Sequence, residues 1–178
     1  MEDDIAFHGR YCQGVVDAVG RIVEQWHEQR PDLDASPMLV VGRIHRLGQL
    51  LDAALRPTFA GADLGQGDFD VLAALRRAGP SFSRTAGELR ESLMVTSGAV
   101  TKQVDRLAAR GLVSREASPD DARVRRITLT DAGVVLVDEL IEVHLDTERR
   151  LLSCLSAQQV SRLASNLAVL AEDLEAKD

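Results

Sequence analysis

The chain has 178 residues, is 45% hydrophobic but only 3% aromatic, and carries a formal net charge of -7 at pH 7. It has no apolar run near the ~18 residues that a membrane-spanning helix needs, and its acidic beginning, Met1 to Asp4, has the wrong charge for a signal peptide. Two cysteines, Cys12 and Cys154, imply no disulfide framework. We therefore expect one soluble, cytoplasmic domain whose core is built from Leu, Val, Ile and Ala on packed helices.

The first part of the chain has the periodicity of helices. Residues 4–30 carry apolar side chains at helical spacing, and Pro31 ends the pattern. Ser36-Pro37 supplies a cap and a favourable first position for a second helix, which Pro57 ends or kinks. A glycine-containing loop then leads to a third helix at about residues 68–78.

Two short helices joined by a tight turn are predicted next. Thr85 and Glu88 form a capping box, in which each side chain bonds the backbone N–H of the other residue. Thr96 or Ser97 can cap the second helix, and Gly111 stands where a helix C-terminus favours glycine. Because the connection is so short, the pair predicts a helix-turn-helix.

A two-stranded hairpin follows the second helix. Residues 112–116 and 124–130 have the character of strands, and the Ser-Pro-Asp-Asp run at residues 118–121 is typical of a turn. A helix-turn-helix followed by such a hairpin is a winged helix. The expected fold class is therefore mainly α with a small β-hairpin wing.

The predicted winged helix is more basic than the rest of the chain. From residue 85 to residue 130 it has eight Lys and Arg against six Asp and Glu, which is a net charge of +2. The basic side chains lie opposite the apolar stripe of the second helix and along the hairpin; they are Lys102, Arg106, Arg110, Arg123, Arg125 and Arg126. A solvated surface would account for the basic charge alone, but the charge, the helix caps and the hairpin together favour DNA binding. The negative charge elsewhere on the chain does not prevent this, because salt screens charges that lie more than about 8 Å apart.

The N-terminal part of a recognition helix reads base edges in the major groove. Gly98 permits close approach of the backbone, Lys102 can donate to guanine or phosphate, and Gln103 can read adenine or bond a phosphate. For Gln103 and Arg106 the alternative is a solvent-facing helix surface. The candidate DNA-contacting residues are Ser97, Gly98, Thr101, Lys102, Gln103 and Arg106 on the helix, with Arg123 and Arg125 in the wing.

The end of the chain predicts two further helices. A long one is expected at about residues 131–152, and a capping box at Ser156 opens the last. In the last helix Leu163, Leu167 and Leu170 repeat in steps of three and four, as on a heptad seam. Such a seam can pack on its own chain or join two chains. Next to a DNA reader it favours a homodimer that binds a pseudo-palindromic double-stranded operator.

The run from Leu89 to Gly133 resembles the MarR family of bacterial transcription regulators. The resemblance is carried by "DRL…RGLV.R" at the end of the recognition helix, by Asp121-Ala122-Arg123 in the wing, and by "LT..G" ending at Gly133. It implies that Asp121 orients Arg123 into the minor groove, where the negative potential of a narrow groove attracts arginine.

The same resemblance implies the organisation of the whole chain. It implies a winged helix-turn-helix with N- and C-terminal dimerisation helices in a single domain, residues 1–178. Residues 66–130 would form the DNA-binding lobe, and the helices of two chains would interlock over residues 4–58 and 131–176.

Two further stretches resemble the urate-responsive subgroup of that family. They are the region around Trp26 with "RPDLD" after it, and "FDVLAALRRAG" at residues 69–79. The resemblance implies a ligand pocket of Trp26, Asp70 and Arg77, with Gln103 where the subgroup has an arginine. A small anionic aromatic ligand would then release the protein from DNA. The alternative is that Trp26 belongs to the core and Arg77 is a surface charge.

No pattern typical of an enzyme is present in the sequence. The four histidines, His8, His27, His45 and His144, have no metal-ligand spacing, and no phosphate-binding glycine loop or nucleophile elbow occurs. We therefore expect no catalysis, metal or cofactor. Two alternatives to a ligand-responsive repressor stay open: a winged-helix dimer that acts through protein–protein contacts, and a redox sensor through Cys12.

Overall fold

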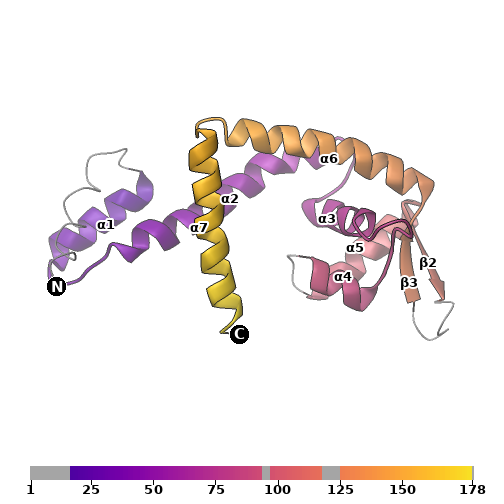
Figure 1. The fold of residues 1–178 in the computed structure, drawn as a ribbon, viewed down its shortest axis with the longest axis horizontal. Helices are drawn as coiled ribbons and strands as arrows, with labels where there is room; N and C mark the ends of the chain where they lie inside the picture. Colours follow the sequence, from indigo (N-terminus) through magenta and orange to yellow (C-terminus); the bar gives the residue numbers. More distant parts are fainter. Residues whose placement is uncertain (1–16, 94–96, 118–124, 178) are drawn as a thin grey trace. The chain divides into compact units, whose positions relative to one another are not determined.

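The computed structural model describes residues 17–93, 97–117 and 125–177, with residues 97–99 described by their backbone alone (Figure 1). Within those ranges the chain forms seven helices and three strands. The chain divides into two compact units, residues 1–54 and residues 55–178, and the boundary falls inside α2 (Pro37–Ala60).

In the first unit, α1 (Ala18–Gln29) is joined to α2 by an ion pair and by a close approach. Asp17 caps α1 by accepting from the Gly20 N–H at 2.7 Å, and the same carboxylate accepts from Arg43 Nε at 2.9 Å. The Arg43 guanidinium holds the pKa of Asp17 below its usual value. Gly42 lets the two helices touch, because a Cβ there would lie 2.9 Å from Val19 Cγ1.

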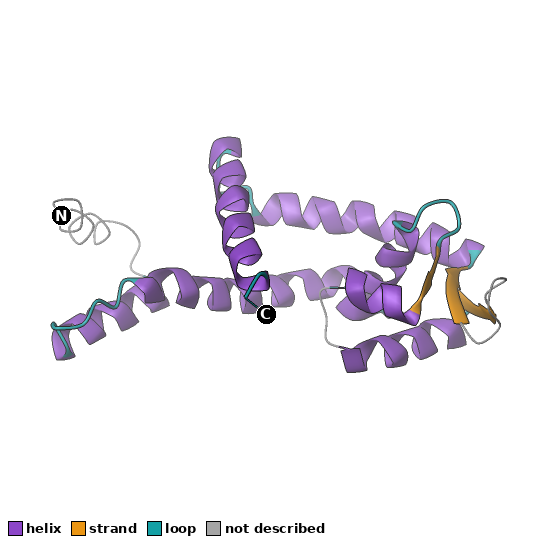
Figure 2. Cartoon of the chain, turned by 60° about the horizontal axis from the view of Figure 1, so that its bottom comes forward, coloured by secondary structure: helices purple, strands orange, loops and turns teal. Residues whose placement is uncertain are grey.

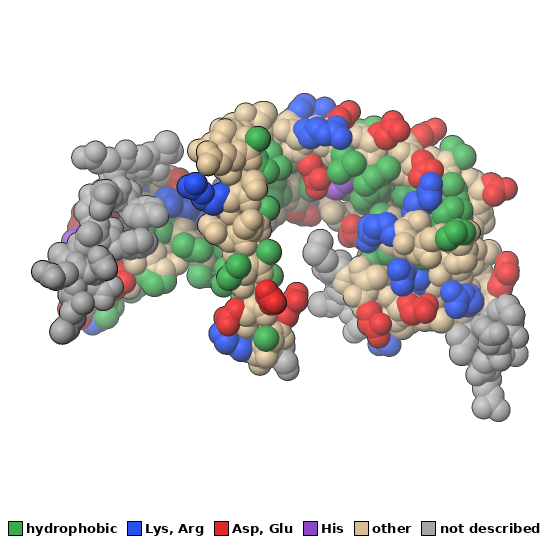
Figure 3. Space-filling view, viewed as in Figure 1, with side chains coloured by type: hydrophobic (Ala, Val, Ile, Leu, Met, Phe, Trp, Pro, Cys, Tyr) green, Lys and Arg blue, Asp and Glu red, His purple; other side chains and the backbone are tan. Residues whose placement is uncertain are grey.

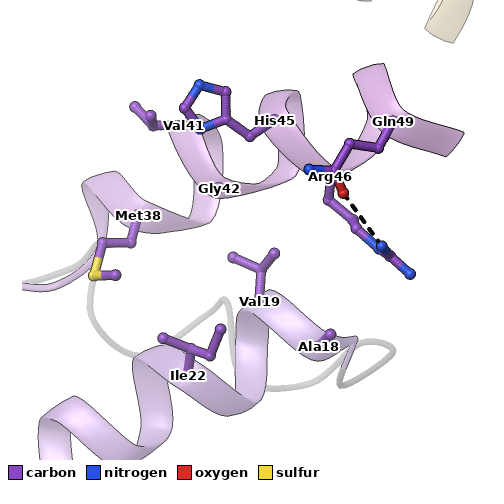
Figure 4. A pocket seen from close by; sticks show the side chains of 9 residues that line it. All are labelled: Ala18, Val19, Ile22, Met38, Val41, Gly42, His45, Arg46 and Gln49. Atoms are coloured by element: carbon purple, nitrogen blue, oxygen red, sulfur yellow. Dashed lines mark hydrogen bonds between the residues drawn. The ribbon is translucent and has the colours of Figure 1, made fainter. Parts of the chain in front are cut away.

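A pocket of about 520 Å³ lies between α1 and α2 (Figure 4). Val19 and Ile22 point toward α2, Met38 closes one end, and Arg46 stands at the other (Figure 4). Arg46 donates a long hydrogen bond of 3.4 Å to Gln49. The walls are therefore aliphatic with a polar end, and none of the ligand-binding residues predicted from the sequence lines them.

Of the two helix ends predicted at prolines, the one before Pro31 is confirmed, whereas Pro57, predicted to end or kink its helix, does not end it. α1 ends at Gln29, before Pro31 as expected, whereas residues 4–16 of the predicted helix lie outside the described residues. α2 begins at Pro37 as expected but runs through Pro57 to Ala60, so Pro57 does not end it. Proline removes a single backbone donor, and the residues after it continue the helix for one more turn.

The second unit contains the winged helix and the last two helices (Figures 1 and 2). This order confirms the expected fold class, a mainly helical chain with a small sheet. Its elements are α3 (Gln66–Arg76), β1 (Ser83–Thr85), α4 (Ala86–Ser92), α5 (Ser97–Ala109), β2 (Val113–Ala117), β3 (Arg125–Leu129), α6 (Asp131–Leu151) and α7 (Ala157–Glu175).

The sheet has one strand more than the sequence predicted. Its order is β1-β3-β2, with both pairs antiparallel, so β3 is central and Ile127 lies between Arg84 and Arg115. The sequence did not predict β1, because this strand is only three residues long and its last residue, Thr85, is also the cap of α4. A stretch that short carries no visible alternation.

The core of the second unit is built around α3. Almost every residue of this helix from Asp68 to Leu75 is buried, and Phe59 at the end of α2 stacks on Phe69 with 4.7 Å between ring centroids. α5 contributes Val104 and Leu107, which are 1% and 0% exposed. Further core side chains come from the strands, α4, α6 and the loops that join the elements, so the helix-turn-helix is fixed against a scaffold that surrounds α3.

The "LT..G" motif joins the sheet to α6. Thr130 caps α6 by accepting from the Gly133 N–H at 3.1 Å, while its own hydroxyl donates to the Gly111 carbonyl at 2.7 Å. The Leu112 carbonyl accepts from the Thr130 N–H at 3.1 Å and lies against the Cα of Gly133, where any Cβ would clash with it. Glycine is therefore required here for space.

Gly133→Ala should destabilise the protein by about 1–3 kcal/mol, because the atom in the way is a backbone oxygen that a hydrogen bond holds in place. Urea unfolding followed by circular dichroism measures this change. Gly48→Ala in α2 is the matched control, since nothing lies within 4 Å of a Cβ there, and it should leave stability unchanged or raise it by up to about 1 kcal/mol. Equal stability of the Gly133 variant and the wild type would contradict the packing described here.

Candidate nucleic-acid interface

The first helix of the helix-turn-helix is fixed by the predicted capping box. The Thr85 N–H donates to Glu88 Oε2 at 2.6 Å, and the Glu88 N–H donates to Thr85 Oγ1 at 3.2 Å. The hydrogen bond from the Thr85 backbone lowers the pKa of Glu88, to which the nearby Arg126 and Arg84 charges add. Backbone N–H groups at the start of α4 are thus hydrogen-bonded by side chains of the same turn.

α5 presents the predicted apolar stripe to the core and a polar face outward. Val100, Val104 and Leu107 are buried, as the helical spacing predicted. Thr101 and Lys102 are exposed on the outer side, and Lys102 makes no hydrogen bond or ion pair with any residue that the structure describes. Ser97 and Gly98 open the helix, where the backbone alone is described.

The Gln103 side chain is buried in this structure. Its side chain is only 9% exposed and lies over Gly67 at the start of α3, so closely that a Cβ on Gly67 would clash with its amide. Its Oε1 atom has no hydrogen-bond partner within the described part of the chain. In this conformation the Gln103 side chain is buried against α3 and is not presented to a base edge, so its predicted role in DNA reading stays a prediction.

Arg106 is held by a buried carboxylate. Its Nε and Nη2 donate to Asp68 Oδ1 at 3.1 and 2.7 Å, and the Asp68 side chain is 2% exposed. The other oxygen of Asp68 accepts from the Gly65 N–H at 3.0 Å and closes the first turn of α3. The hydrogen bond from Asp68 raises the pKa of Arg106, so this cation is paired within the protein although its side chain is 58% exposed.

Arg110 is also bound within the unit, at the end of α5. Its Nη1 and Nη2 donate to the carbonyl oxygens of Asp63 and Ala62 at 2.7 and 2.8 Å. Of the three basic residues that the sequence placed on the outer face of the recognition helix, only Lys102 is without such a contact among the described residues.

The hairpin carries its arginines in different environments. Arg125 is exposed at the start of β3, whereas Arg126 turns back and donates to Ser83 Oγ at 3.0 Å and to the Ser83 carbonyl at 3.1 Å. Arg115 on β2 pairs with Asp105 on α5 at 2.6 Å and ties the hairpin to the recognition helix. The predicted pair of Asp121 and Arg123 lies outside the described residues.

The surface of this region mixes both signs of charge. On the face drawn in Figure 3, Lys and Arg side chains lie among Asp and Glu side chains around α3 to α5. That face of the region therefore presents cations interspersed with carboxylates, rather than one uniform basic surface.

The residues of the predicted ligand pocket fall in both units. Trp26 belongs to the first unit and is 46% exposed. Asp70 and Arg77 belong to the second, half-buried and exposed respectively, and burial raises the pKa of Asp70 against the opposing charges of His144 and Arg77. Their common pocket stays a prediction. Cys12 lies outside the described residues.

The described ranges hold neither a metal-binding cluster nor a membrane-spanning helix. No group of three or more His, Cys, Asp or Glu side chains there is arranged to hold a metal ion. Likewise, no helix in residues 17–93, 97–117 and 125–177 is both long and apolar enough to cross a membrane.

Comparison with known proteins places this geometry among transcription regulators. A family model described as "MarR family" matches residues 62–124. The transcriptional regulator PecS of Dickeya dadantii is 37% identical over 149 residues, which cover 84% of this chain and 90% of PecS. The multiple antibiotic resistance protein MarR of Escherichia coli is 31% identical over 128 residues, or 71% of this chain and 87% of MarR.

Solved structures agree with the sequence comparison. The crystal structure of an Escherichia coli MarR mutant complexed with operator DNA has a TM-score of 0.66 and 28% sequence identity, and covers 82% of this chain and 96% of that one. The crystal structure of AbsC from Streptomyces coelicolor has the same fold, with a TM-score of 0.72 at 21% identity over 81% of this chain and 97% of that chain.

Proposed function

The chain belongs to the MarR family of DNA-binding transcriptional regulators, and from that premise we propose that it is a cytoplasmic, homodimeric repressor released from its operator by a small anionic aromatic effector. The observation that carries the proposal is the outer face of α5, where Thr101 and Lys102 are exposed while the opposite side is buried in the core. A recognition helix reads bases from such a face.

The proposed DNA contacts are polar residues of α5 and the hairpin for which no side-chain hydrogen bond or ion pair within the described part of the protein is seen. Thr101 and Lys102 face outward, Ser97 and Gly98 lie at the helix start, and Arg125 is exposed at the hairpin. Arg123, supported by Asp121, remains proposed from the family resemblance as the minor-groove contact.

Lys102→Ala should weaken operator binding by about 1–3 kcal/mol and lower the salt slope of binding by about 1, because a cation that meets DNA is lost. Fluorescence anisotropy with labelled duplex at several salt concentrations measures both values. The chain has only one other lysine, Lys177, which pairs with Asp173 at the end of α7. Lys177→Ala is therefore the matched control and should bind as the wild type does. Unchanged binding by the Lys102 variant would remove this residue from the interface.

A homodimer is supported by apolar side chains that the units leave exposed. α7 has no buried residue, and Leu163, Leu167 and Leu170 on its heptad seam are 38–43% exposed. In the first unit, Ile44 and Leu47 on α2 are also exposed. Exposed apolar surface of this extent is typical of an interface. Two copies joined by such helices would place two recognition helices about one helical turn of DNA apart, and the operator would be a pseudo-palindrome.

Leu167→Glu should convert the dimer to monomers at micromolar concentration, because it places a charge in the apolar seam. Size-exclusion chromatography with light scattering measures the mass. Val169 lies on the opposite side of α7 and is 69% exposed, so Val169→Glu should remain dimeric. A dimer that survives Leu167→Glu, or that Val169→Glu disrupts equally, is incompatible with a seam through Leu167.

The proposed effector is a small aromatic anion such as urate or salicylate. Arg77 offers an exposed planar donor fork for a carboxylate or an ionised ring, and Trp26 offers an exposed stacking surface. To act as a switch, the effector must bind the DNA-free state more tightly, by about 1–3 kcal/mol for a typical coupling.

Titration with such anions should change Trp26 emission over the same concentration range that releases DNA, since Trp26 is the only tryptophan. Arg77→Ala should abolish both responses. Arg77→Lys, which keeps the charge but loses the planar fork, should retain them only in part. Release of DNA without a change in Trp26 emission would locate the effector elsewhere.

A further inference from the structure

Three side chains of α5 contact one short segment of the chain, residues 62–68, named here the α2–α3 segment. Gln103 lies over Gly67, Arg106 pairs with Asp68, and Arg110 donates to the Ala62 and Asp63 carbonyls. The three α5 residues are three and four positions apart, so they share one stripe of the helix. From its middle to the residue after its end, the recognition helix is therefore attached to a segment that precedes the helix-turn-helix.

The α2–α3 segment is itself firmly held. The Phe59 carbonyl accepts from the Ala62 and Leu64 N–H groups, each at 3.1 Å, and the Phe59 and Leu64 side chains are buried in the core. Asp63 has a φ of 52°, a left-handed conformation that a well-determined turn must enforce. A segment with this many constraints can serve as a fixed reference for a neighbouring helix.

We propose that Gln103, Arg106 and Arg110 are positioning residues that set the recognition helix on the α2–α3 segment and thereby determine operator specificity without contacting DNA. The proposal rests on the proposed function, because it takes α5 to be the helix that reads the operator. It assigns a role in specificity to residues 62–68, a part of the chain outside the helix-turn-helix.

The chemistry of each contact suits positioning. The Arg110 guanidinium bonds two neighbouring carbonyls at once, and this fork fixes direction as well as distance. Asp68 is buried and joins the first turn of α3 to Arg106. Gln103 fills the space over Gly67 and packs the middle of α5 against the start of α3.

Specific base reading is sensitive to such placement. A binding constellation has to be held within about 0.5 Å of its productive geometry, and a shifted helix loses bonds to base edges while its contacts to the DNA backbone adapt more readily. Loss of a positioning residue should therefore lower affinity for the operator and leave affinity for random DNA nearly unchanged.

Direct contact between these arginines and phosphate makes the opposite prediction. Removing a phosphate contact weakens binding uniformly across sequences and lowers the salt slope by about 1. The pair of measurements, discrimination and salt slope, thus separates the two roles.

The experiment uses the full-length protein, an operator selected from a random duplex pool, and a random duplex of equal length. Arg110→Lys keeps the charge but loses the planar fork that reaches two neighbouring carbonyls through separate nitrogens, and Asp68→Asn alters a residue too buried to touch DNA. We expect each to lower the ratio of operator to random-duplex affinity roughly tenfold, the scale of one mismatched base pair, with an unchanged salt slope. Arg149→Lys, at the exposed pair with Asp146 on α6, is the matched control and should keep the wild-type ratio.

An unchanged ratio in Arg110→Lys, or an equal loss for both duplexes with a reduced salt slope, would overturn the proposal. Thermal melting of each variant identifies a folding defect. If Asp68→Asn does not fold, the result for Arg110→Lys, at an exposed position, tests the proposal by itself. Failure of the proposed function is distinguishable, because the wild-type protein itself would then select no operator.

Discussion

The DNA-binding unit depends on a single buried carboxylate. Asp68 is 2% exposed, closes the first turn of α3 through the Gly65 N–H, and accepts two hydrogen bonds from Arg106 on the recognition helix. A charge removed from water in this way is costly unless it is paired and fully hydrogen-bonded. The pairing therefore constrains both helices: α3 cannot move from α5 without leaving the carboxylate uncompensated. The apolar core around α3 supplies the free energy of folding, and this contact fixes the relation of the two helices.

Features encoded by neighbouring residues could be predicted from the sequence. The Thr85 and Ser156 capping boxes need only a residue and its third neighbour, and both form as expected. Gly111 adopts the left-handed conformation that its place after α5 required, with a φ of 70°. The two strands of the hairpin and the helices that flank them follow from periodicity and turn residues. Local chemistry was thus sufficient for the helix-turn-helix and for the two strands of the hairpin.

Features that depend on distant residues could not be predicted in this way. Helical spacing showed that Gln103, Arg106 and Arg110 lie away from the apolar stripe, but it carries no information about what lies opposite them. Their partners precede them by 36 to 48 residues along the chain, and only tertiary structure brings the two together. β1 was not predicted for a related reason, since it pairs with β3, and the partner of its middle residue, Arg84, lies 43 residues later. The wing pair of Asp121 and Arg123 rests on family resemblance alone.

The junction at Thr130 has a mechanical consequence. β3 ends at Leu129 and α6 begins at Asp131, so one residue separates the central strand of the sheet from a helix of 21 residues. The hydroxyl of that residue, Thr130, is hydrogen-bonded to both Gly111 and Gly133, and Gly133 lies in close contact with the Leu112 carbonyl. At 1.5 Å per residue α6 is roughly 31 Å long, so a tilt of about 5° at one end displaces the other by roughly 3 Å. A rotation of the winged helix that carries α6 with it would therefore become an ångström-scale shift at the far end of α6.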